Sequence, residues 1–160
     1  MRKFNPAGAT VTLAIALLFA VSLTQTAPAY AQENGLVTVR SKMSFNQTVS
    51  QLKKMIAKNG MMVLSTLNQG KVMAMTGLQM DDISLFVGNP TVGHKLFAAD
   101  RGVGVAVPIR VNIYKNMNGN TYVSYVKPTA QLAPFHNKQI DMIARMLDNK
   151  LGMMTGMISK

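Results

Sequence analysis

The chain contains no cysteine. This absence excludes disulfides, thiol nucleophiles, thiolate metal sites, covalent haem attachment and a lipid anchor on cysteine. Acidic residues are also scarce, since six Asp and Glu stand against 17 Lys and Arg. Carboxylates are the commonest partners of histidine in acid–base catalysis, so the chain has few groups from which an active site can be built.

The few ionisable side chains form no recognisable catalytic pattern. The histidines, His94 and His136, stand far apart in the sequence, and Asp81-Asp82 fall in a predicted turn. Turns use aspartate for local hydrogen bonds, and no serine lies in a nucleophile-elbow context. We therefore predict a non-enzymatic protein, with an enzyme of unrecognised type as the remaining alternative.

A secretory leader is predicted over residues 1–31. Arg2 and Lys3 supply its positive start, and an apolar run follows from Val11 to Leu23. Ala29 and Ala31 then provide the small residues that a signal peptidase accepts. The apolar run has 13 residues, fewer than the ~20 needed to span a bilayer. We expect cleavage after Ala31, export, and no stable membrane span afterwards.

The remaining residues, 32–160, are predicted to form one domain of 129 residues in the periplasm or outside the cell. Their formal net charge of +9 would attract anionic partners. Only Lys53-Lys54 are adjacent, and no aromatic residues alternate with the basic ones. This scatter favours a general solubilising role over nucleic-acid binding.

The hydrophobic pattern predicts an α+β domain in the order β-α-β-β-α-β-β-α, a small mixed or antiparallel sheet with helices packed on one face. Gln69-Gly70 is interpreted as a turn, Pro108 as an edge or bulge position, and Gly152 as the stop of the last helix. The expected strands cover residues 36–39, 61–67, 83–87, 103–114 and 121–126, and the expected helices cover 44–60, 90–99 and 137–151.

Between Val37 and His136 the chain resembles the family called domain of unknown function 302. The resemblance implies a compact α+β domain that forms dimers and has no established enzymatic activity. An acidic residue is expected from that family at Ala106, so a function that needs this carboxylate is in doubt here. The likeness is carried by Arg40-Ser41, Phe45, Leu52-Lys53, 85–90 with Gly93, 107–110, Tyr114, Gly119, 122–125, Pro128 and His136.

The segment from Gly88 to Lys95 is the best local candidate for a binding site. A strand that ends in a tight turn before a helix presents free backbone N–H groups and the positive end of the helix dipole, which together favour an anion. An ordinary strand–turn–helix connection is the competing interpretation. We expect a homodimer that binds a small or anionic ligand through Asn89, Gly93, His94, Lys95 and Arg110.

Methionine is unusually frequent, with 13 residues after the leader. Flexible core filling and a dimer interface both explain such a content. Thioethers also bind soft Cu(I) or Ag(I), for which Met142, Met146 and His136 are the candidate ligands. A noncovalent haem held by a His/Met pair belongs to the same alternative. Our first expectation is no cofactor, and copper is the alternative.

Overall fold

A five-stranded sheet organises the chain. The computed structural model describes residues 35–159, so the predicted leader with Ala29 and Ala31 lies outside the described residues. All strand pairs are antiparallel, and the order across the sheet is β1-β5-β4-β3-β2. The predicted α+β class is confirmed. The strands are β1 (Leu36–Arg40), β2 (Met62–Leu67), β3 (Asp82–Gly88), β4 (Ile109–Lys115) and β5 (Thr121–Val126).

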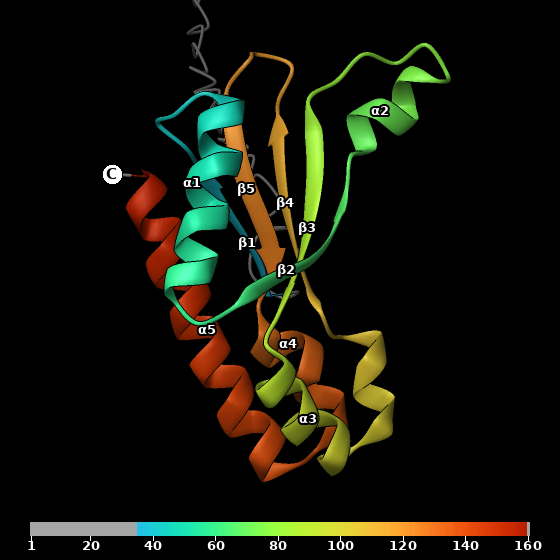
Figure 1. Ribbon diagram of the computed structural model, residues 1–160, viewed down its shortest axis with the longest axis vertical. Helices are drawn as coiled ribbons and strands as arrows, with labels where there is room; N and C mark the ends of the chain where they lie inside the picture. The colour runs from blue at the N-terminus through green and yellow to red at the C-terminus, as the bar shows by residue number, and fades with distance from the viewer. Residues whose placement is uncertain (1–34, 160) are drawn as a thin grey trace, which may run out of the picture.

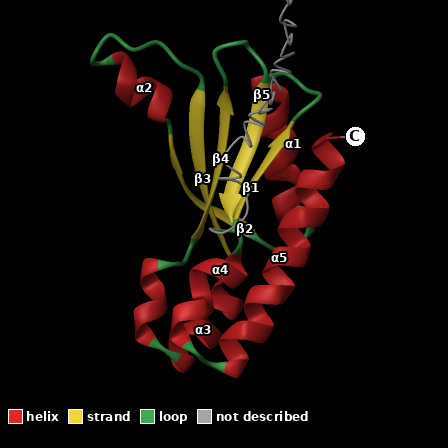
Figure 2. Cartoon of the chain, turned by 180° about the vertical axis from the view of Figure 1, so that it is seen from behind, coloured by secondary structure: helices red, strands yellow, loops and turns green. Residues whose placement is uncertain are grey.

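The helices occupy three places around this sheet. Helices α1 and α5 cover one face, α3 and α4 gather beyond one end of the strands, and α2 stands beyond the other end (Figures 1 and 2). None of the helices within residues 35–159 is long and apolar enough to cross a membrane. The helices are α1 (Phe45–Lys58), α2 (Gln69–Ala74), α3 (Pro90–Ala99), α4 (Pro128–Leu132) and α5 (Lys138–Ser159), with short 3₁₀ turns η1 (Arg101–Val105) and η2 (Ala133–Phe135).

Alternation along the central strands separates the two faces of the sheet. In β4, Ile109, Val111 and Ile113 are buried beneath the helices, whereas Arg110 and Asn112 point to the other face. The main hydrophobic cluster is formed by these residues with the inner faces of α1 and α5. Because a shift of one residue would exchange the two faces, burial fixes the register of the sheet.

A second, smaller hydrophobic cluster lies beyond the end of the strands. It joins α3, η1 and α4 to the first turns of α5. Val92 and Ile143 pack against both clusters and therefore mark the seam between them. The buried members of the second cluster are Leu96, Val103, Ala106, Leu132, Ile140 and Ala144.

Local signals place α1 as the sequence predicts. The Ser44 hydroxyl accepts from the Gln47 N–H, and the Gln47 side chain accepts from the Ser44 N–H, which is a complete capping box. The helix ends at Lys58, and Gly60 follows with φ of +69°. A left-handed residue after a helix is the ordinary role of glycine there.

Three predictions before the last helix are wrong. Gln69-Gly70 is not a turn but the start of α2, because the Asn68 side chain accepts from the Lys71 N–H and caps a helix. The strand predicted from Val103 begins only at Ile109, since η1 buries Val103 and Ala106 three residues apart. Pro108 precedes a central strand rather than lying in an edge strand, and its bond to Val107 is cis.

The predicted stop at Gly152 is also wrong. Helix α5 continues to Ser159, and Gly152 is not among the glycines with positive φ. Met154, Thr155 and Ile158 lie on the buried side of this extension. Their burial extends the helix past a residue of poor helix propensity.

The position of Gly152 inside a helix leads to a first prediction. A Cβ built there meets no atom within 4 Å, so Gly152→Ala adds no clash and removes backbone freedom from the unfolded chain. We expect the free energy of unfolding in urea to rise by about 0.5–1 kcal/mol. The control is Gly60→Ala, which should lower stability because its φ is positive. A loss of stability in Gly152→Ala would contradict a helical Gly152.

Candidate functional site

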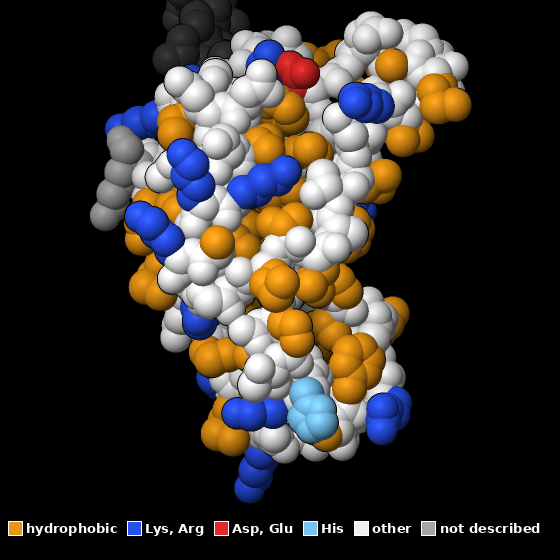
Figure 3. Space-filling view, viewed as in Figure 1, with side chains coloured by type: hydrophobic (Ala, Val, Ile, Leu, Met, Phe, Trp, Pro, Cys, Tyr) orange, Lys and Arg blue, Asp and Glu red, His pale blue; other side chains and the backbone are white. Residues whose placement is uncertain are grey.

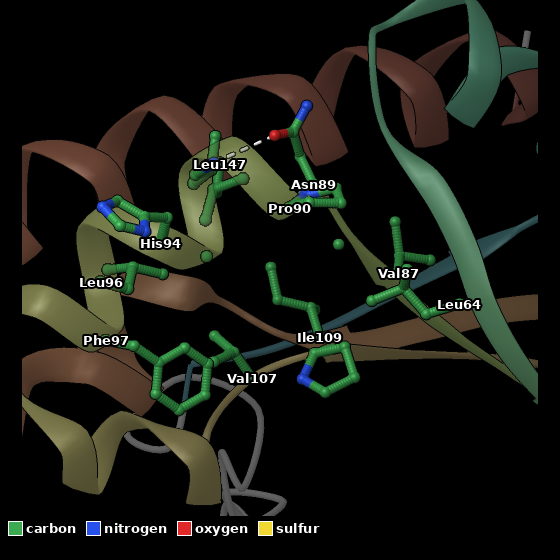
Figure 4. A pocket seen from close by; sticks show the side chains of 14 residues that line it. Leu64, Val87, Asn89, Pro90, His94, Leu96, Phe97, Val107, Ile109 and Leu147 are labelled. Carbon is green, nitrogen blue, oxygen red and sulfur yellow. Dashed lines mark hydrogen bonds between the residues drawn. The ribbon is translucent and has the colours of Figure 1, made fainter.

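A cavity of about 380 Å³ opens at the seam between the two hydrophobic clusters. Strands β2, β3 and β4, helix α3 and helix α5 each contribute to its wall (Figure 4). Most of the wall is aliphatic or aromatic. Its residues are Leu64, Val87, Gly88, Asn89, Pro90, Val92, Gly93, His94, Leu96, Phe97, Val107, Pro108, Ile109 and Leu147.

A bulge in β2 supplies one end of the wall. The pairing of β2 with β3 shifts between Val63 and Ser65, which leaves Leu64 as the extra residue. The Leu64 side chain then lies against Gly88, where an added Cβ would be 2.9 Å from Leu64 Cδ1. Glycine at position 88 therefore allows Leu64 to close this end of the cavity.

Asn89 fixes the turn from β3 into α3. Its Oδ1 accepts from the Val92 N–H at 3.0 Å, and its Nδ2 donates to the Gly60 carbonyl oxygen at 2.6 Å. The first bond caps α3, and the second ties that helix to the loop after α1. Both polar ends of the Asn89 amide are thus engaged within the protein.

The start of α3 offers little to an anion. Pro90 has no N–H, the Val92 N–H is donated to Asn89 Oδ1, and the Gly93 N–H is donated to the Asn89 carbonyl oxygen. Among the first four positions of α3, this leaves the Thr91 N–H to meet a ligand. The predicted positive end of the helix dipole is present, but its N–H groups are largely used by the protein itself.

The residues predicted for the ligand site are only partly brought together. Asn89, Gly93 and His94 line the cavity, and in Figure 4 His94 lies at the α3 end, opposite Val87 and Leu64. Lys95 is exposed and is not part of the wall. Arg110 lies on the other face of the sheet, one residue beyond the wall residue Ile109.

Arg110 belongs to a separate polar network on that face. Its Nε donates to Ser84 Oγ at 2.9 Å, and its NH2 group donates to Gln69 Oε1 at 3.1 Å. Ser84 also contacts Asn112, which donates to Asp82 Oδ2 at 3.2 Å. The network ties α2 to β3 and β4, so Arg110 has a structural role at this position.

The candidate metal ligands lie on and before α5. Met142 and Met146 are four residues apart on the exposed side of the helix. His136 precedes α5 and has φ of +46°, outside the helix that carries the two thioethers. No group of three His, Asp or Glu side chains within residues 35–159 has metal-binding geometry. The copper interpretation stays a prediction.

Several wall residues had no sequence signal as site residues. Leu64, Val107 and Leu147 come from three distant segments, and each reads locally as a core residue. Phe97 belongs to a helix that was predicted, but nothing in the sequence shows that its ring borders a cavity. Away from this wall, burial raises the pKa of the Tyr125 hydroxyl, and a hydrogen bond with Thr155 opposes that rise.

Comparison with known proteins gives a family and a fold. The family model described as "Domain of unknown function DUF302" matches residues 37–158. A crystal structure of an uncharacterized conserved DUF302 protein from Bacillus stearothermophilus superposes with a TM-score of 0.72 at 21% identity, and covers 78% of this chain and 98% of that chain. At this identity the likeness shows the fold.

Three curated relatives come from Brucella species. The proteins named fluoride-specific ion channel FluC 1 of Brucella suis biovar 1 (strain 1330) and of Brucella abortus biovar 1 (strain 9-941) are each 29% identical over 106 residues. FluC 2 of Brucella melitensis biotype 1 has the same identity over the same length. These matches cover 66% of this chain but only 39–41% of the relatives, so the chain spans about two fifths of their length.

The double role of Asn89 leads to a second prediction. Asn89→Ala removes the cap of α3 and the bond to Gly60, so we expect the free energy of unfolding in urea to fall by about 2 kcal/mol. The matched control is Asn68→Ala, which removes a cap of α2 and no bond to another helix. It should cost about 1 kcal/mol. Equal losses in the two variants would show that the Gly60 bond contributes nothing.

Proposed function

The chain belongs to the DUF302 family, whose model matches almost all of the described residues, and from this premise we propose that the protein is a non-enzymatic binding domain for a small, largely apolar molecule. The supporting observation is the cavity at the seam of the two hydrophobic clusters. Its volume of about 380 Å³ falls in the range of small-molecule sites, ~300–1,000 Å³.

The wall favours an apolar ligand over a charged one. Val87, Phe97 and Ile109 present hydrocarbon to the interior, and the Asn89 amide is already hydrogen-bonded within the protein. A charge moved into such a cavity would lose its water without gaining partners. A ligand with an apolar body and a polar end near His94 fits this arrangement. We therefore favour such a ligand over the anion that the sequence predicts.

The same wall supports a binding role rather than catalysis. His94 is the single ionisable side chain among the residues that line the cavity. Acid–base and nucleophilic mechanisms need at least two positioned groups around the reacting atoms. We therefore assign His94 the role of a polar contact at the cavity's edge.

The ion-channel activity of the Brucella relatives belongs to those proteins as wholes. Fluoride is a small, strongly hydrated anion, and an apolar wall cannot replace its water. We leave fluoride outside the proposed ligand class for this physical reason.

Export and self-association complete the proposal. The order of positive start, apolar run and Ala29-Tyr30-Ala31 supports export to the periplasm or beyond, with a mature chain that begins at Gln32. A homodimer agrees with what the family resemblance implies.

The ligand proposal is tested by filling the cavity. The neutral fluorophore 1-aminoanthracene should bind the parent chain and shift its emission to the blue. Val107→Phe places a larger side chain in the wall and should weaken this binding about tenfold or more. The matched control is Val105→Phe, whose residue is 89% exposed and does not line the cavity. The control should bind like the parent.

Two results would count against the apolar site. Equal binding of the dye by both valine variants would place the dye elsewhere. The second experiment adds inorganic phosphate to the protein. We expect phosphate to leave the thermal midpoint of unfolding unchanged. A rise in the midpoint with phosphate that is lost in Lys95→Ala would favour the anion site instead.

A further inference from the structure

The outward side of α5 is apolar where a surface helix is ordinarily polar. Four methionines recur there at spacings of four, seven and four residues, which places them within ~60° of one another around the helix. They face away from the buried residues Ile140, Leu147 and Ile158. Their exposed fractions are 65% for Met142, 38% for Met146, 54% for Met153 and 60% for Met157. We call this set the methionine row.

The methionine row is long and is interrupted once, by the exposed Asn149 between Met146 and Met153. From Met142 to Met157 it runs ~22 Å along the helix axis. Gly152 and Gly156 border it without side chains, and a Cβ built at either meets no atom within 4 Å. Met142, Met153 and Met157 are more than half exposed within residues 35–159, whereas Met146 is partly covered. Exposed apolar side chains grouped along one side of a helix in this way mark a surface that contacts something else.

Positive charge surrounds the row. Lys138 and Arg145 are exposed on α5 beside it, and the neighbouring α1 exposes Lys53, Lys54 and Lys58. Figure 3 shows blue basic side chains spread over α1 and α5, with orange apolar atoms along α5 at the left. Red acidic atoms are nearly absent from this face of the described residues.

Two acidic residues of α5 border the row. Asp148 lines the same hollow as Met153 and Met157, and its carboxylate accepts hydrogen bonds from the N–H and the hydroxyl of Thr129 at 3.2 and 2.6 Å. Asp141 lies two turns earlier on the same side and is half-buried. The α1 helix carries no acidic residue. The outward helical surface is therefore both apolar and basic.

We propose that this surface docks on an anionic phospholipid bilayer, with the methionine row at the level of the headgroups and the flanking Lys and Arg side chains on the lipid phosphates. Helices bind at the membrane interface when an apolar strip is accompanied by basic residues. Charge complementarity selects the anionic lipid, because a cationic surface gains most from a negative one. This docking is independent of the cavity ligand.

Charge also argues against two other partners for the methionine row, a second copy of the chain and a nucleic acid. A second copy of the chain would bring the same lysines and arginines against each other, and like charges repel across an interface. A nucleic acid would satisfy the basic residues but would leave the thioethers against a charged, hydrated backbone. A bilayer interface provides phosphates and hydrocarbon within a few ångströms of each other.

The absence of cysteine makes a local test direct. Met153→Cys in the full chain gives one thiol, which is labelled with the polarity-sensitive dye bimane. Vesicles of phosphatidylglycerol and phosphatidylethanolamine should shift the emission of the probe at position 153 to the blue, and pure phosphatidylcholine vesicles should not. The shift should weaken in 1 M salt, where the Debye length falls to ~3 Å.

The matched control is the same dye on Met75→Cys, since Met75 is 86% exposed on the distant α2 end. No shift is expected there. In addition, replacing all four methionines of the row by Gln should reduce vesicle binding in sedimentation about tenfold or more. The pair Met75→Gln and Met117→Gln should leave vesicle binding unchanged.

The results of these experiments distinguish a bilayer from the other partners of the methionine row. Failure of the parent to sediment with anionic vesicles overturns the proposal. So does sedimentation without a shift at position 153, or with equal shifts at positions 153 and 75, because the contact would then lie elsewhere. A shift at position 153 that grows with protein concentration in the absence of lipid would assign the row to a second copy of the chain.

Discussion

The continuous burial of one side of α5 is the interaction on which the rest of the structure depends. Its first turns place Ile140 and Ala144 in the smaller hydrophobic cluster, and its later turns place Leu151 and Ile158 in the main one. One helix of 22 residues joins the two clusters. The long helix therefore makes a single domain from a sheet and a group of short helices.

The cavity follows from this arrangement. The wall residues along the seam come from different elements, and the space that they leave between them is the cavity. Leu147 reaches the seam from α5, and Leu64 reaches it from the bulge in β2. Asn89 bonds the start of α3 to the loop after α1 at this seam. The site is a consequence of how the layers are joined.

Sequence reasoning succeeded where the signal is local. The expected helices at 44–60 and 90–99 and the expected strand at 121–126 each depend on a few neighbouring residues, and the structure has α1, α3 and β5 at these places. It failed where tertiary burial overrides local preference, as at Gly152. Of the cavity wall, the sequence indicates only Asn89, Gly93 and His94, since the opposite wall comes from residues far away in the sequence.

The methionines show why composition could not decide their role. Met153 and Met154 are adjacent, yet the first is more than half exposed and the second is fully buried. Their difference is the 100° turn between successive residues of a helix, which matters only once the helix is known to pass Gly152. A helix that ended at Gly152 would leave both without a defined face. The same extension that buries Met154 in the core thus adds Met153 and Met157 to the outward row, which Met142 and Met146 begin before Gly152.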